Sequence, residues 1–146
     1  MINGTKSTNE NCKNLILIGE DDMDDKEIIE EAFAEIDPSV KVHFVTNGKK
    51  LISFLQETSA DDLPSLIVID YNMPGLNGAE ILKSLENNSK VKNIPKVIWS
   101  TSGASQYKST CLALGAYDYL VKPSSVNDLE NLVKYLLSLC KVSLKN

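Results

Sequence analysis

The sequence predicts an α/β fold in which helices cover both faces of a parallel β-sheet. Two observations support this prediction. Short apolar runs such as 15–18 and 66–69 lack polar alternation, which is typical of strands buried on both faces. These runs alternate with stretches of helical periodicity, so that strand and helix follow each other five times in 146 residues. Alternation of this kind with short connections is typical of a parallel sheet.

The first two strand–helix units occupy the first part of the chain. Residues 15–18 form a continuous apolar run and predict a buried strand. In 24–36, apolar residues recur at helical spacing, and acidic residues at its start favour the positive end of a helix. Residues 40–46 alternate polar and apolar side chains, as an edge strand does. The only histidine, His43, lies in this run and is predicted to face solvent. Residues 48–59 predict a short helix.

The third unit is central to the predicted site. Its apolar strand, 66–69, ends at Asp70. Two glycines, a proline and two asparagines follow between residues 71 and 78, which is the composition of a loop. Residues 79–86 then predict a helix with one apolar face.

The last two units begin with a third buried strand at 97–99. Residues 104–114 predict a helix whose apolar stripe is sparse, ended by a left-handed cap at Gly115. Residues 117–121 predict a strand, and 126–141 show the strongest helical periodicity in the chain.

These units indicate one domain. We expect a folded domain at 15–141, between a flexible tail at 1–14 and a short tail at 142–146. With 42% hydrophobic and 24% charged residues, the composition is that of an ordinary soluble protein.

Charge and composition exclude several classes of function. Residues 20–31 hold eight acidic side chains against the single Lys26, so we expect no direct nucleic-acid partner for that region. No apolar run approaches the ~20 residues that span a bilayer, and the first residues lack the apolar core of a secretion signal. Three cysteines without metal-ligand spacing, Cys12, Cys111 and Cys140, are predicted to be free thiols in a reducing cytoplasm.

Polar residues stand at the ends of four predicted strands. They are Glu20, Asp21, Asp70, Ser100 and Lys122. In a parallel sheet the carboxyl ends of the strands share one edge, which is where α/β proteins bind ligands. Gathered carboxylates repel one another unless a cation lies between them, and oxygen ligands favour Mg²⁺. A carboxylate beside a metal, a hydroxyl and an amine together suit phosphoryl transfer, in which the carboxylate is the nucleophile.

The same residues resemble the receiver domains of two-component response regulators. The resemblance covers 15–140 and rests on the acids after the first strand, the Asp-Tyr-Asn-Met-Pro-Gly run from Asp70, Ser100 with Thr101, and Lys122 with Pro123. It implies a flavodoxin-like (βα)5 fold with strand order 2-1-3-4-5. The spacing between Asp21 and Asp70 resembles the stand-alone regulators paired with bacterial phytochromes.

The resemblance also implies a role for each site residue. Asp70 would accept the phosphoryl group, with Ser100 and Lys122 binding that group. Mg²⁺ would be held by Glu20, Asp21, Asp70 and the backbone carbonyl of Asn72. Tyr119 stands at the position of the switch aromatic, which would change packing together with Ser100 on phosphorylation. The family's bend at Lys122–Pro123 implies a cis peptide there.

Two features depart from the family or leave an alternative open. Gly19 stands where the family has an aliphatic residue, which is expected to loosen the packing beside the metal site. The run of acids also allows Asp21 with Asp22 as the metal-binding pair, although Glu20 and Asp21 directly follow the strand.

The resulting hypothesis is a single-domain signalling protein. It would take a phosphoryl group from a sensor histidine kinase or a phosphotransfer protein, with no enzymatic activity beyond its own phosphorylation and dephosphorylation. The signal would leave through the 104–141 face, toward a target protein or a second copy of the chain. The alternatives are an aspartyl-nucleophile phosphohydrolase, for which Asn72 is not the expected general acid, and a receiver-like scaffold that is never phosphorylated.

Overall fold

The computed structural model describes residues 14–101 and 105–140 and confirms the predicted parallel sheet. Its five strands run in the order β2-β1-β3-β4-β5, which is the flavodoxin-like order expected from the family resemblance. The strands are β1 (Leu15–Gly19), β2 (Lys41–Val45), β3 (Leu66–Asp70), β4 (Lys96–Ser100) and β5 (Asp118–Val121). Every neighbouring pair is parallel.

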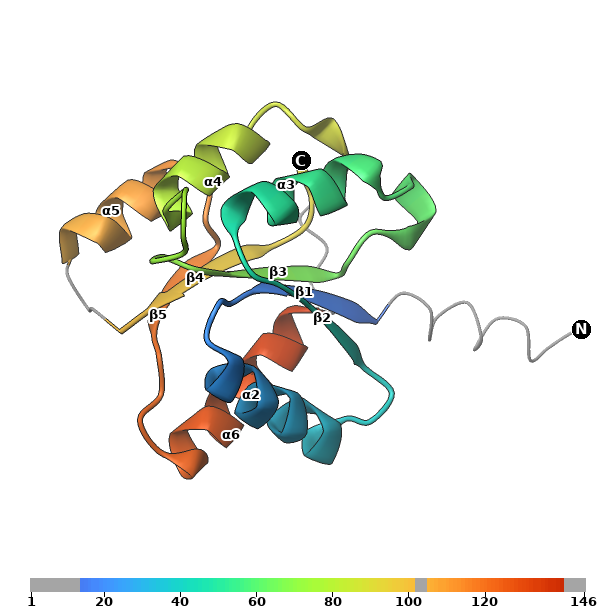
Figure 1. Ribbon diagram of the computed structural model, residues 1–146, viewed down its shortest axis with the longest axis vertical. Coiled ribbons are helices and arrows are strands. Elements are labelled where there is room, and N and C mark those ends of the chain that lie inside the picture. Colours follow the sequence, from blue (N-terminus) through green and yellow to red (C-terminus); the bar gives the residue numbers. More distant parts are fainter. Residues whose placement is uncertain (1–13, 102–104, 141–146) are drawn as a thin grey trace, which may run out of the picture.

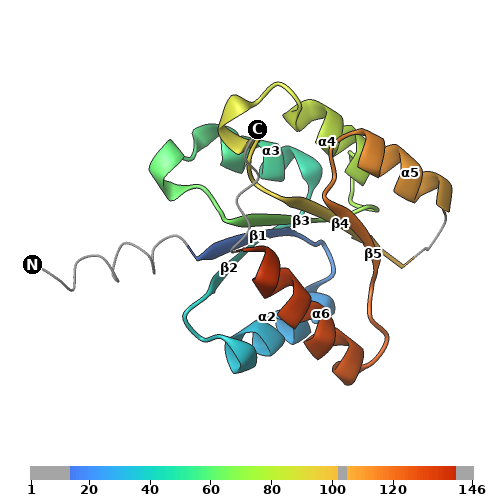
Figure 2. The same cartoon turned by 180° about the vertical axis from the view of Figure 1, so that it is seen from behind.

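Helices cover both faces of this sheet. They are α2 (Met23–Ile36), α3 (Gly48–Glu57), α4 (Gly78–Leu85), α5 (Ser105–Ala113) and α6 (Val126–Leu139). Figure 1 shows α2 and α6 together on one face and α3, α4 and α5 on the other, and the reverse view in Figure 2 agrees. Two short 3-10 turns, Ala60–Asp62 and Ser89–Val91, were not predicted.

The two helical layers create two apolar cores separated by the sheet. Alternate residues of β1 serve opposite cores: Leu17 packs with α3 and α4, and Ile16 and Ile18 pack with α2 and α6. This division explains why the central strands are continuously apolar. At the edge, β2 alternates instead, and His43 is exposed as predicted, stacked on Phe54 with ring centroids 4.7 Å apart.

Side-chain caps fix where the helices next to the sheet edge begin. Asp22 accepts hydrogen bonds from the amides of Asp24 and Asp25 and starts α2. Asn77 starts α4 in a capping box with Glu80, and Ser125 starts α6. Gly115 has φ +106°, which confirms the predicted left-handed residue after α5.

The element boundaries agree with the sequence predictions to within two residues over the described chain. Apart from Asn14, whose carbonyl accepts from the Lys41 amide over 2.9 Å, the predicted tails lie outside the described residues. So do the first residue of the 104–114 helix and the last residue of the 126–141 helix. Within the described part, no helix is long and apolar enough to cross a membrane. Cys111 is a buried thiol without a disulfide, and burial raises its pKa.

Candidate functional site

The carboxyl edge of the sheet collects the polar residues singled out in the sequence. Glu20 and Asp21 directly follow β1, and Asp70 is the last residue of β3. Register places Asp70 opposite Trp99 of β4, and Ser100 opposite Val121 at the end of β5. Lys122 follows at once, and its amide donates to the Ser100 carbonyl over 2.8 Å. Four strand ends therefore converge because parallel strands in this register end at the same edge.

Three carboxylates lie close enough to share one cation. Oxygens of Glu20, Asp21 and Asp70 all lie within 4.8 Å of one another. Glu20 is 2% exposed and Asp70 is 6% exposed, whereas Asp21 faces solvent. Asp22 instead points its side chain at the start of α2, where it accepts from the Asp24 amide over 2.9 Å. A compact set of oxygen ligands with excess negative charge fits a hard divalent cation such as Mg²⁺.

Lys122 joins two of these carboxylates. Its Nζ lies 2.8 Å from Glu20 Oε1 and 2.9 Å from Asp70 Oδ2. Burial alone lowers the pKa of Lys122, but the hydrogen bonds and negative charges of Glu20 and Asp70 outweigh it, so the pKa lies above its usual value. The side chain therefore stays protonated and places a positive charge beside Asp70.

Glu20 is the most buried acid of the cluster. Burial raises the pKa of its carboxyl, while hydrogen bonds from Lys122 and from the Asp22 amide act in the opposite direction. The Asp22 amide donates to Glu20 Oε2 over 3.1 Å. Both oxygens of this carboxylate therefore have donors, which is how a protein keeps a buried acid in place.

A hydrogen bond to Asp70 organises the loop after β3. The amide of Asn72 donates to Asp70 Oδ1 over 3.0 Å, which ties the loop to the carboxylate itself. Asn72 is exposed and Met73 behind it is buried. The loop thus presents the Asn72 backbone beside Asp70.

Ser100 and Tyr119 lie on neighbouring strands, β4 and β5. Ser100 is fully buried at the end of β4, and Tyr119 is 5% exposed. The Tyr119 ring packs in the core under α3, α4 and α5, in the same cluster as Tyr71 and Cys111. The aromatic ring therefore points inward in this structure.

The Lys122–Pro123 peptide corrects one prediction. No cis peptide occurs in the described residues, so this bond is trans. The trans form is intrinsically preferred by roughly 0.5–1 kcal/mol before proline. Lys122 reaches both Glu20 and Asp70 from a trans bond, so no cis bend is needed to aim the side chain.

Gly19 corrects a second prediction, because the packing around it is tight. A Cβ atom on Gly19 would lie 2.6 Å from Met73 Cε and 3.1 Å from Leu51 Cδ1. The larger Met73 side chain occupies the space that an aliphatic residue would take. The missing volume at position 19 is thus filled from the β3–α4 loop.

Two residues near Lys122 were missed by sequence reasoning. Asp25, in the first turn of α2, lies 3.6 Å from Lys122 Nζ, and the Trp99 ring centroid lies 5.8 Å from the same atom. Both line a pocket of about 300 Å³ between α2 and the start of α6. Asp25 looked like one of many acids in a charged helix, and Trp99 like a core residue of a buried strand. Only the position of α2 against the β5–α6 loop singles them out.

Comparisons with known proteins agree with this geometry. The profile of the response regulator receiver domain family matches residues 16–134. The chain is 31% identical over 131 residues to the two-component response regulator ARR17 of Arabidopsis thaliana, covering 84% of each. It is 37% identical over 97 residues to ORR11 of Oryza sativa subsp. indica, covering 66% of this chain and 64% of that protein.

Solved structures give the same picture. The phosphorylated cyanobacterial phytochrome response regulator RcpA has a TM-score of 0.78 and 26% identity, covering 91% of this chain and 99% of that one. The Mn²⁺-bound form of response regulator Rcp1 has a TM-score of 0.76 and 27% identity, with the same two coverages of 91% and 99%. A response regulator in red light signalling of R. palustris has a TM-score of 0.79 and 26% identity, covering 90% and 98%.

Proposed function

The chain belongs to the response regulator receiver domains of two-component systems, and from that premise we propose that it accepts a phosphoryl group on Asp70 in a Mg²⁺-dependent reaction. The observation that carries the proposal is the cluster of Glu20, Asp21 and Asp70 oxygens within 4.8 Å, with the Lys122 ammonium 2.9 Å from Asp70. Those groups supply a nucleophile, a cation site and a positive charge in one place.

The chemistry assigned to Asp70 is displacement at phosphorus. A carboxylate oxygen of Asp70 attacks the phosphorus of a phosphorylated histidine, the phosphorus–nitrogen bond breaks, and the histidine nitrogen keeps the electron pair. Lys122 is close enough to pair with a phosphoryl oxygen, and Ser100 ends the adjacent strand, where its hydroxyl can donate to another. Mg²⁺, when bound, supplies positive charge beside the phosphoryl oxygens.

Glu20, Asp21, Asp70 and the Asn72 carbonyl are the residues that would hold this cation. Glu20 and Asp21 are preferred over Asp21 and Asp22 because Asp22 is already used as the cap of α2. The Mn²⁺-bound form of Rcp1 adds support by similarity. Each ligand is an oxygen, as Mg²⁺ prefers.

The surface that sends the signal is proposed to be the 104–141 face. Four of its described residues are large apolar side chains that remain exposed: Leu112 by 41%, Tyr117 by 41%, Val121 by 57% and Val126 by 68%. α5 buries little of its surface, since Cys111 is its only buried residue, which is typical of an element that can shift at low cost. A target protein or a second copy of the chain would bind there when Asp70 is phosphorylated.

The phosphoryl donor is proposed to be a sensor histidine kinase or a phosphotransfer protein in the cytoplasm. The donor must bring its histidine to Asp70, so it must cover the surface beside the site. That surface carries the acidic residues of α2 and the exposed Met23 and Ile28. Its negative charge disfavours nucleic acid as a direct partner.

The decisive experiment is intact-mass spectrometry after treatment with acetyl phosphate. We expect one added phosphoryl group with Mg²⁺, none in excess chelator, and none in Asp70→Asn. Asp21→Asn and Glu20→Gln should weaken Mg²⁺ binding. Asp22→Asn is the matched control, because asparagine also caps helices. Labelling that persists in Asp70→Asn would overturn the assignment.

The switch and the output face need their own measurement. Amide exchange would be compared between the free protein and the protein with beryllofluoride, which stands in for the phosphoryl group. We expect changes in 105–140 for the native chain and smaller changes in Ser100→Ala. Changes confined to α2 and α3 would show that another face carries the signal.

A further inference from the structure

Lys122 hydrogen-bonds to carboxylate oxygens that a bound cation needs as ligands. Its Nζ lies 2.8 Å from Glu20 Oε1 and 2.9 Å from Asp70 Oδ2. The other oxygens of these two side chains accept from the Asp22 and Asn72 amides. An ammonium and a divalent cation held by the same two carboxylates would repel each other. Cation binding therefore requires Lys122 to move away from at least part of this position.

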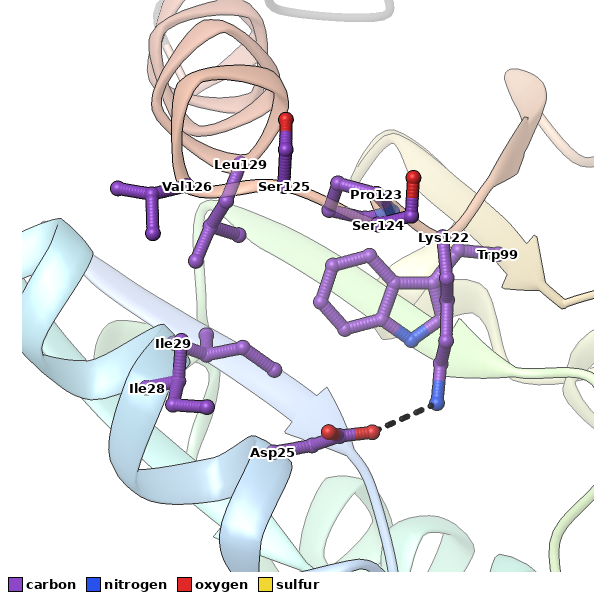
Figure 3. A pocket seen from close by; sticks show the side chains of 10 residues that line it. All are labelled: Asp25, Ile28, Ile29, Trp99, Lys122, Pro123, Ser124, Ser125, Val126 and Leu129. Atoms are coloured by element: carbon purple, nitrogen blue, oxygen red, sulfur yellow. Dashed lines mark ion pairs between the residues drawn. The ribbon is translucent and has the colours of Figure 1, made fainter.

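The structure offers other partners for the ammonium when it moves. Asp25 Oδ2 lies 3.6 Å from Lys122 Nζ, and its side chain is 43% exposed, so it is free to follow. The Trp99 ring centroid lies 5.8 Å from the same nitrogen, within the range of a cation–π contact. Figure 3 shows Lys122 extending beside the indole toward Asp25, at one end of the pocket of about 300 Å³.

We propose that Asp25 and the indole face of Trp99 form a second position for the Lys122 ammonium, which it takes when a divalent cation binds Glu20 and Asp70. Asp25 is then a positioning residue that makes cation binding easier without being a ligand. The inference rests on the proposed cation site and adds a role for two residues outside it.

The neighbour of Asp25 provides a matched control. Asp24 has the same charge, lies in the same first turn of α2 and is exposed. Among the described residues, however, the ion pairs of Lys122 are with Glu20, Asp70 and Asp25. Removing the charge of either Asp24 or Asp25 makes the electrostatic potential at the cation site less negative. Only the Asp25 carboxylate can receive the ammonium.

Calorimetric titration of the full chain with Mg²⁺ tests the proposal. It is done in about 0.5 M salt, which screens exposed charges at long range. Asp25→Asn should weaken Mg²⁺ binding about threefold or more, as for residues in one ion-pair network, and Asp24→Asn by less than about twofold. In a Lys122→Gln background, Asp25→Asn should have no further effect. Trp99→Phe, which keeps an aromatic face, should bind better than Trp99→Leu.

The same titration separates the possible failures. Equal weakening by Asp24→Asn and Asp25→Asn, or an unchanged Asp25→Asn effect in the Lys122→Gln background, overturns the second position and leaves the cation site intact. No Mg²⁺ binding by the native chain overturns both. If Lys122→Gln does not fold, the comparison of Asp24→Asn with Asp25→Asn decides the question alone. The indole N–H resonance of Trp99, the only tryptophan, should shift on Mg²⁺ addition more in the native chain than in Asp25→Asn.

Discussion

Tyr71, the residue after Asp70, stacks on Tyr107 of α5 with ring centroids 4.7 Å apart and ring planes 20° apart. The contact links the candidate phosphoryl site to a helix that buries only Cys111. An aromatic pair of this kind contributes about 0.5–1.5 kcal/mol beyond its burial. The stack therefore attaches α5 to the rest of the domain in addition to the buried Cys111.

Tyr107→Ala should loosen α5 without disturbing the carboxylates. We expect faster amide exchange in 105–113 and unchanged phosphorylation of Asp70, because Tyr107 does not contact the acidic cluster. Tyr107→Phe should keep the stack and the slow exchange. Tyr117→Ala, which removes an exposed tyrosine near the same helix, is the control. Unchanged exchange in Tyr107→Ala would show that α5 is held by other contacts.

Lys122→Ala should destabilise the protein most strongly in the absence of divalent cations. The change leaves Glu20 buried without its partner, and breaking a buried ion pair costs about 3–5 kcal/mol. Chemical denaturation in excess chelator measures this loss. Adding Mg²⁺ should return part of the stability, because the cation would neutralise the same carboxylates. Equal stability of variant and native chain in chelator would contradict the structural role of the pair.

The same variant gives a pH dependence with a defined sign. Burial already raises the pKa of Glu20, and Lys122 opposes that effect. Without Lys122 the pKa rises further, so the folded state holds a proton that the unfolded state releases. Stability of the variant should therefore fall as the pH rises above the ordinary carboxyl value of 4.5. The gap to the native chain should widen as the pH rises above 4.5, and it should stay constant if Glu20 does not titrate.

Much of this fold could be predicted because strong local patterns agree with it. The continuous apolar runs at β1 and β3 are buried on both sides, and the alternation at β2 marks the edge. The site followed from one rule, that the carboxyl ends of parallel strands meet. Five polar residues from four strand ends could be placed together without any coordinates.

What could not be predicted depends on how the layers pack against each other. The proximity of Asp25 to Lys122 requires the position of α2 relative to the β5–α6 loop, which no local pattern encodes. The sequence does not show that Lys122 can reach Glu20 and Asp70 from a trans bond at Lys122–Pro123, as it does in the structure. Gly19 was misjudged because its neighbour Met73 comes from a different segment.

The Gly19–Met73 contact predicts a size exchange. Gly19→Val should destabilise the protein by about 1–3 kcal/mol, the usual cost of overpacking, since a Cβ there would lie 2.6 Å from Met73 Cε. Met73→Ala alone should also destabilise it by leaving a cavity. The double variant should be more stable than the sum of the two losses predicts. Additive losses in urea denaturation would show that the two side chains do not share this space.

Tyr135 of α6 donates a hydrogen bond to Asp118 Oδ2 over 2.6 Å, which fastens α6 to the start of β5. Burial, the hydrogen bond and the charge of Asp118 raise the pKa of Tyr135 to about 12. An unfolded tyrosine has a pKa of about 10, so the folded state favours the neutral phenol. The resulting stability is fully present below pH 10 and is lost as the pH rises toward 12.

Tyr135→Phe should therefore cost about 1 kcal/mol near pH 8, the typical contribution of a hydrogen bond. The difference from the native chain should be constant from about pH 7 to pH 9 and shrink as the pH rises from 10 toward 12. Urea denaturation gives the stability difference, and ultraviolet absorbance identifies the tyrosine that ionises last. Tyr117→Phe, at an exposed tyrosine, should leave that late component in place. If the late-ionising component is lost in Tyr117→Phe and persists in Tyr135→Phe, the raised pKa belongs to Tyr117 and not to Tyr135.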